Sequence, residues 1–178
     1  MERVARPQRV LGIDPGLQCT GYGVLELAEG EIHLCEAGVI RTKRHELLSE
    51  RLKELFEGIT EVLESWEPQA TALEELYSHG QYPRTAVLMG HARGVICLAC
   101  AQREIPVIHY GSTQIKKMVT GNGRASKDQM QRAIARQLKV AALPGPADVA
   151  DALALALCHC YALRQELLGA GECISQGG

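Results

Sequence analysis

Aromatic side chains are scarce in this 178-residue sequence, which holds one Trp and one Phe and is 4% aromatic. The core therefore has to be aliphatic. No low-complexity segment is present, and 46% hydrophobic with 22% charged residues is ordinary globular usage, so disorder is excluded. The length predicts one compact domain over residues 1–178, with a core at about 8–168 and a flexible tail at about 169–178.

Long hydrophobic runs are also missing. The longest apolar stretch, from Ala152 to Leu163, is shorter than the roughly 20 residues that a membrane-spanning helix needs. The first residues lack the apolar segment of a secretory signal. We therefore expect a cytoplasmic protein that does not cross a membrane.

The sequence holds seven cysteines, an odd number, so they cannot all pair within the chain. Two tight pairs, Cys97 with Cys100 and Cys158 with Cys160, lie inside apolar helical stretches without polar loop residues around them. This setting favours free thiols in a reducing compartment over a zinc site.

A formal net charge of −2 conceals a strong asymmetry along the chain. Residues 112–140 hold seven cations and one acid, a net charge of +6, which leaves −8 for the rest. A basic segment on an acidic body suits a protein that holds a polyanion in one place. The alternative for Arg132, Arg136 and Lys139 is a solvated helix face opposite the apolar stripe.

Short apolar runs predict strands at residues 9–13, 20–27, 32–40, 70–73 and 105–110, the first three as an antiparallel meander. Helical spacing of apolar residues predicts helices at 47–66, 83–103, 112–119 capped by Ser112, 126–138 with a capping box, and 147–167. Strands that alternate with helices indicate an α/β fold, a mixed five-stranded sheet flanked by helices.

Carboxylates stand where these elements end or begin. Asp14 and Glu74 each end an apolar strand, and Asp148 and Asp151 share one face of the first turn of the last helix. Strand ends and helix starts collect at one edge of an α/β sheet, where clustered carboxylates favour a hard divalent cation, Mg²⁺ or Mn²⁺. The alternatives are a turn-forming role for Asp14 and dipole-stabilised helix acids at Asp148 and Asp151.

A set of ordered motifs resembles the RuvC-type Holliday junction resolvases over nearly the whole chain. The motifs are Leu11-Gly12-Ile13-Asp14-Pro15-Gly16, Thr20-Gly21-Tyr22-Gly23, Ile40-Arg41-Thr42-Lys43, Leu73-Glu74-Glu75, Gly90-His91-Ala92-Arg93-Gly94 and Asp148-Val149-Ala150-Asp151-Ala152-Leu153-Ala154. The resemblance implies a ribonuclease-H-like fold and a homodimer that nicks two like-polarity strands of a four-way DNA junction symmetrically. It further implies 5′-phosphate and 3′-hydroxyl ends, and a branch-migration motor of the RuvA-RuvB type as a partner.

By the same resemblance, Asp14, Glu74, Asp148 and Asp151 are the catalytic residues that bind metal, with two Mg²⁺ per site and Mn²⁺ as a substitute. Lys116 and Lys127 match basic residues near the scissile phosphate, and Lys127 is assigned a catalytic role. Tyr77 matches an aromatic that contacts DNA near the junction centre. Lys117 and Arg124, from the basic segment, are assigned to DNA binding. Glu75, next to Glu74, leaves open whether it shares in metal binding.

Burial under a loop is the alternative for Tyr77, and a solvated surface position is the alternative for Lys116 and Lys127. Gly90, Ala92 and Gly94 permit close helix approach, so the helix at 90–101 is the candidate dimer face. Two other functions fit parts of the sequence: a four-way-junction-binding architectural protein that does not cleave, and an ATP-binding fragment of the actin-like superfamily. The second lacks room for a second lobe and has no Gly-x-x-x-x-Gly-Lys loop.

Overall fold

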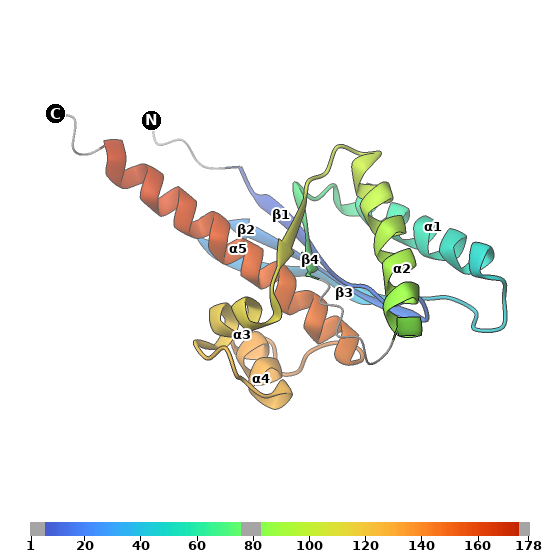
Figure 1. Ribbon diagram of the computed structural model, residues 1–178. Coiled ribbons are helices and arrows are strands. Elements are labelled where there is room, and N and C mark those ends of the chain that lie inside the picture. The colour runs from blue at the N-terminus through green and yellow to red at the C-terminus, as the bar shows by residue number, and fades with distance from the viewer. Residues whose placement is uncertain (1–5, 76–82, 175–178) are drawn as a thin grey trace.

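The computed structural model, which describes residues 6–75 and 83–174, is built on one five-stranded mixed sheet (Figure 1). The strands are β1 (Gln8–Asp14), β2 (Cys19–Ala28), β3 (Glu31–Arg41), β4 (Ala70–Glu74) and β5 (Val107–Tyr110), in the order β3-β2-β1-β4-β5. Strands β1 to β3 form the predicted antiparallel meander, and β4 and β5 add in parallel to β1. The expected fold class is confirmed.

Helices cover both faces of the sheet. One core holds Leu11, Ile13 and Val24 beneath α1 (Leu48–Trp66) and α2 (Pro83–Ala101). The other holds Val10 and Leu25 beneath the remaining helices, which are α3 (Ser112–Thr120), α4 (Lys127–Gln137) and α5 (Ala147–Ile174). Neighbouring strand residues enter different cores because side chains alternate across a sheet.

Local sequence signals set most helix ends. Helix α1 ends at Glu67 in the left-handed conformation (φ 44°), just before Pro68, and Ser126 with Gln129 forms the predicted capping box of α4. Most predicted boundaries differ from the structure by no more than two residues, but one cap and one helix end differ in kind. Ser112 is the first residue of α3 after Gly111 and makes no side-chain cap, and α5 continues past the expected end at residue 167 to Ile174.

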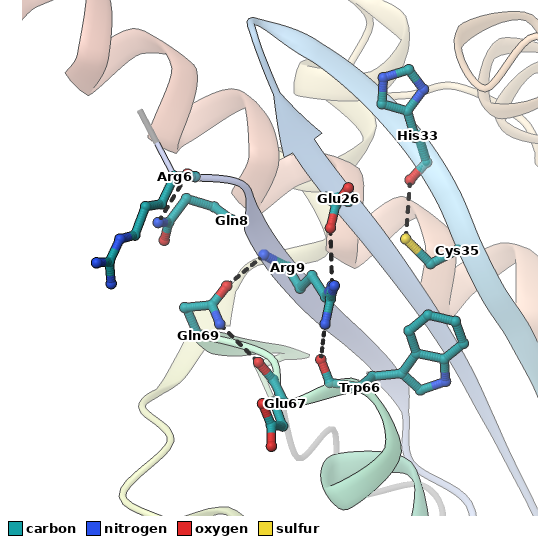
Figure 2. Close-up of polar contacts among 9 residues, drawn as sticks. All are labelled: Arg6, Gln8, Arg9, Glu26, His33, Cys35, Trp66, Glu67 and Gln69. Carbon is teal, nitrogen blue, oxygen red and sulfur yellow. Dashed lines mark hydrogen bonds and ion pairs between the residues drawn. The ribbon is translucent and has the colours of Figure 1, made fainter. Parts of the chain in front are cut away.

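Arg9 ties three segments together at the start of β1 (Figure 2). Its Nε donates to Glu26 Oε2 of β2 at 3.0 Å, and its Nη1 donates to the carbonyl of Trp66 at the C-terminal end of α1 at 3.1 Å. Its backbone N–H donates to Gln69 Oε1 at 2.6 Å, in the turn before β4. A cation at these carbonyls also complements the helix dipole. The α1 to β4 connection is thus anchored at the end of the sheet where β1 begins.

Two glycines let α5 lie directly on the sheet. A Cβ on Gly12 of β1 would stand 2.0 Å from the carbonyl oxygen of Ala152, and one on Gly21 of β2 would stand 2.2 Å from that of Asp148. No side chain fits in that space, so glycine is required at both positions. The first turn of α5 therefore packs against the strands next to Asp14, which is paired with Gly21.

The cysteines and His159 have structural surroundings. Six of the seven cysteines are free thiols, as predicted: Cys19, Cys35, Cys97, Cys100, Cys158 and Cys160, of which the last three are buried. His159 is buried, and its Nδ1 lies 2.7 Å from the hydroxyl of Tyr110. Across the described residues, no helix is long and apolar enough to cross a membrane.

Candidate active site

Two of the predicted carboxylates lie side by side at the sheet edge. Strands β1 and β4 are parallel neighbours with Ile13 opposite Leu73, so the next residues, Asp14 and Glu74, both stand at the carboxyl ends of adjacent strands. This is the edge of an α/β sheet where ligands usually bind. Parallel pairing over a separation of 60 residues is what brings these two acids together.

The first turns of α5 supply the other two carboxylates. The close contact at Gly12 and Gly21 holds the backbone of Asp148 against β2, and Asp151 follows one turn later. The thiol of Cys19, the first residue of β2, donates to Asp148 Oδ2 at 3.3 Å. Cys19 was not among the predicted site residues.

A pocket of about 240 Å³ opens beside these acids and joins them to the basic segment. Glu74 and Asp151 line it together with Lys116 of α3 and Lys127, the first residue of α4. Ser112 also lines it, at the start of α3. Two of the four predicted acids and both predicted lysines, from four separate segments, therefore line one cavity, whereas Asp14 and Asp148 do not line it.

Burial and mutual repulsion disfavour ionised carboxylates here. Burial is the largest cause that raises the pKa of Asp14 to about 7, and the charges of Asp151, Asp148 and Glu74 raise it further, while Lys127 opposes the shift. The pKa of Asp151 is also raised, first by loss of hydration, although much of its side chain remains exposed, while Lys127 and Lys116 lower it. The site thus concentrates negative charge that a cation would neutralise.

The donor set fits a hard divalent cation. It consists of carboxylate oxygens, the ligands that Mg²⁺ and Mn²⁺ prefer. Burial first, and then repulsion from the other acids, raises the pKa of Asp14, and a bound cation would offset both. In the described part of the chain, no three His, Cys, Asp or Glu side chains are already arranged around one ion position. The charges of Asp151, Asp148 and Glu74 nevertheless act on Asp14, so the four acids are close enough to interact electrostatically.

Arg93 of α2 is a site neighbour that we did not predict. Its Nη1 donates to the backbone carbonyl of Glu74, and its Nη2 lies 2.6 Å from His109 Nδ1 on β5. Burial and then the Arg93 charge lower the pKa of His109, which favours the neutral imidazole as the acceptor. Arg93 thereby clamps the end of β4 that carries Glu74. The Gly90–Gly94 motif contained this residue, but spacing does not reveal its contact.

The remaining predicted residues lie outside the pocket. Lys117 and Arg124 are exposed on α3 and on the loop before α4. Glu75 follows β4 and donates its backbone N–H to the carbonyl of Tyr110 at 2.9 Å. Tyr77 falls outside the described residues. Ala92 lies on the side of α2 that packs into the core and is fully buried there. It therefore cannot belong to the exposed dimer face on which we expected it.

Comparison with known proteins gives one consistent family. The profile of the family described as crossover junction endodeoxyribonuclease RuvC matches residues 10–159. The chain is 53% identical over 152 residues to the crossover junction endodeoxyribonuclease RuvC of Rhodopirellula baltica, with 85% of each chain covered. It is 43% identical to the protein of the same name from Thermomicrobium roseum, covering 85% of this chain and 91% of the other.

Solved structures agree. Thermus thermophilus RuvC in complex with Holliday junction substrate has a TM-score of 0.83 at 32% identity, covering 89% of this chain and 96% of that one. The yeast mitochondrial Holliday junction resolvase Ydc2, at 15% identity and a TM-score of 0.64, shares the fold. These likenesses confirm the expected ribonuclease-H-like fold class.

Proposed function

Because the chain belongs to the RuvC family and is therefore a crossover junction endodeoxyribonuclease, we propose that its carboxylate pocket hydrolyses one phosphodiester of a Holliday junction. The observation that carries this proposal is the pocket with Glu74 and Asp151 on one side and Lys116 and Lys127 on the other. Acids alone would repel a phosphate, and lysines alone would only bind it. Together they suit metal-assisted phosphodiester hydrolysis.

Asp14, Glu74, Asp148 and Asp151 are the residues that would hold Mg²⁺, as two ions per site, with Mn²⁺ as a substitute. When bound, the metal supplies an activated water and charge neutralisation at the phosphate. The raised pKa of Asp14 means that the apo site holds a proton near neutral pH, which binding would displace.

Lys127 and Lys116 stabilise charge on the phosphate as it passes through the pentacoordinate state. Water attacks phosphorus in line, and the bond from phosphorus to the 3′ oxygen breaks. The 3′ oxygen leaves as a hydroxyl with the proton that the attacking water gives up, and the phosphate stays attached to the 5′ oxygen of the other strand end. Lys117, Arg124 and Tyr77 complete the DNA contacts in this proposal.

Symmetric incision of two strands needs two active sites and hence a homodimer. The outer face of α2 supports such a contact: Val87 and Leu98 are 59% and 52% exposed, and the helix surface at Gly90 and Gly94 is open. These residues recur at spacings of three and four, so they form one stripe. Replacement of Leu98 by Glu should give a monomer in light scattering, whereas an unchanged dimer mass would place the interface elsewhere.

A branch-migration motor of the RuvA-RuvB type, and a cytoplasmic site of action on chromosomal DNA, belong to the same proposal. They rest on the family alone.

The central test is nicking of a labelled synthetic four-way junction against a linear duplex of the same sequence, with Mg²⁺ or with EDTA. We expect paired nicks only with junction, metal and wild-type protein, and none with Asp14→Asn. Asp128→Asn is the matched control, because Asp128 is the one aspartate of the chain outside the proposed quartet and is exposed on α4. It should cleave like the wild type.

Tight, metal-independent junction binding by the wild type with no cleavage in Mg²⁺ or Mn²⁺ would contradict the proposal. That result would favour the architectural protein that binds junctions without cutting them. Ligation of the nicked products by DNA ligase checks the ends, because ligase requires a 5′-phosphate and a 3′-hydroxyl.

A further inference from the structure

We propose that a second cavity, beside α4 and separate from the carboxylate pocket, binds backbone phosphates of a duplex arm of the junction. The cavity has a volume of about 310 Å³. Its lining residues come from the α3–α4 loop and from one face of α4: Thr120, Asn122, Gln129, Arg132 and Arg136, with Ala125 and Ala133 between them. The proposal rests on the proposed action on DNA junctions and adds where an arm of that DNA is held.

The loop side of this phosphate cavity is preformed. Thr120 Oγ1 donates to the carbonyl of Lys116 at 2.7 Å and accepts the backbone N–H of Asn122 at 3.1 Å. Asn122 Oδ1 in turn accepts the N–H of Arg124 at 3.0 Å. These bonds hold the loop against the end of α3 before any ligand arrives. A preformed wall lowers the entropic cost of binding.

The helix side carries uncompensated positive charge. Arg132 and Arg136 are one turn apart on α4, where like charges repel. In the described part of the chain, no ion pair involves either guanidinium, and no acidic side chain lines the cavity. Arg132 Nε donates to the backbone carbonyl of Asp128 at 3.2 Å, which leaves the positive charge of the guanidinium in place. Lys139, by contrast, pairs with Glu31 at 3.1 Å. A bound polyanion would relieve the repulsion between the two arginines, whereas water alone only screens it.

The chemistry of the cavity selects phosphate oxygens. Guanidinium groups present planar pairs of N–H donors that match phosphate. The side-chain oxygens of Asn122 and Gln129 accept backbone N–H groups, so their amide NH2 groups are suited to donate to further phosphate oxygens. Backbone phosphates carry no sequence information, so the contact orients an arm without reading its bases.

The phosphate cavity adjoins the carboxylate pocket. Ala125 lines both cavities, and α4 runs from Lys127 in one to Arg136 in the other. Nine helical residues span about 13 Å. That distance equals about four base pairs of duplex at 3.4 Å each. A duplex that runs along α4 with its scissile phosphate at Lys127 can therefore place a phosphate about four base pairs away at Arg136, and another about two base pairs away at Arg132.

The test measures binding of a fluorescent four-way junction by anisotropy in EDTA, so that no cleavage occurs, over a range of salt concentrations. Arg132→Gln together with Arg136→Gln should weaken binding at least tenfold at low salt. It should also reduce the slope of log K against log salt by about 1 to 2, because each lost phosphate contact accounts for about 0.9. Arg6→Gln with Arg164→Gln is the charge-matched control, since both arginines are exposed, Arg6 precedes β1 and Arg164 lies near the far end of α5.

A second set of junctions carries uncharged methylphosphonates about four base pairs from the cleavage position. They should weaken the wild type and the control but have no further effect on the double variant, because the contact is already lost. Equal binding by the double variant and the control, or a full methylphosphonate effect in the double variant, would overturn the phosphate cavity. A wild type that binds junction no better than linear duplex would instead refute the proposed function, whatever the variants do.

Discussion

Replacement of Asp14 by Asn should stabilise the metal-free protein while it abolishes cleavage. The carboxyl of Asp14 is held at the sheet edge, where burial and three other acids raise its pKa from 3.8 to about 7. Above pH 7 the folded protein must carry this charge in an unfavourable place, whereas the unfolded chain carries it in water. Asparagine keeps the shape of the side chain and removes the charge.

The expected gain in the free energy of unfolding follows from the raised pKa of Asp14. A difference of about three pKa units at roughly 1.36 kcal/mol each gives about 4 kcal/mol as an upper value at pH 8. Relaxation around the site reduces this figure, so we expect roughly 2–4 kcal/mol. For a chain of this size, about 2–4 °C per kcal/mol corresponds to a rise in Tm of roughly 4–16 °C.

The raised pKa of Asp14 also determines how the stability of the wild type changes with pH. Between pH 4 and pH 7 the folded state binds more protons at Asp14 than the unfolded state, so the free energy of unfolding of the wild type falls as the pH rises. At pH 4 Asp14 is protonated in the fold, and the advantage of Asp14→Asn should nearly vanish. Saturating Mg²⁺ at pH 8 should stabilise the wild type and leave Asp14→Asn much less affected.

Differential scanning calorimetry from pH 4 to pH 8, with EDTA and then with Mg²⁺, measures these differences. Asp128→Asn serves as the control, because it removes an exposed carboxylate of α4. Equal slopes of Tm against pH for the wild type and Asp14→Asn would show that the carboxyl of Asp14 does not destabilise the fold. So would a lower Tm for Asp14→Asn at pH 8 in EDTA.

Three further changes test other parts of the structure. Arg93→Ala removes the donor to the carbonyl of Glu74. It should raise the Mg²⁺ concentration for half-maximal cleavage about tenfold and leave junction binding in EDTA unchanged, and Arg93→Lys should restore part of the loss. Weaker junction binding in EDTA would instead mean that Arg93 contacts DNA. Gly12→Ala should cost about 3 kcal/mol or more in urea unfolding, because its Cβ would meet the α5 backbone at 2.0 Å, and a loss below about 1 kcal/mol would show that α5 can shift freely. Tyr110→Phe should cost about 1–3 kcal/mol, because it leaves the buried His159 Nδ1 without its 2.7 Å partner, and a neutral result would mean that water replaces the hydroxyl.

Local sequence patterns predicted most of the secondary structure and part of the candidate site. Short apolar runs located the five strands, helical spacing of apolar residues located the helices, and the Ser126–Gln129 pair predicted the start of α4. Asp14 and Glu74 were identifiable because an acid that ends an apolar strand is expensive to bury without a partner. The ordered motifs indicated the family that the comparisons confirm.

Contacts between distant segments were decided only by the tertiary structure. Three features depend on how elements far apart in sequence pack. They are the close contact of α5 with Gly12 and Gly21, the hydrogen bond from Arg93 to the carbonyl of Glu74, and the burial of Ala92. The phosphate cavity has the same origin, because it needs the loop after α3 to lie beside one face of α4. Periodicity assigns a residue to a face of its own element, but the partner of that face is set by strand order, register and helix placement, which arise when the whole chain packs.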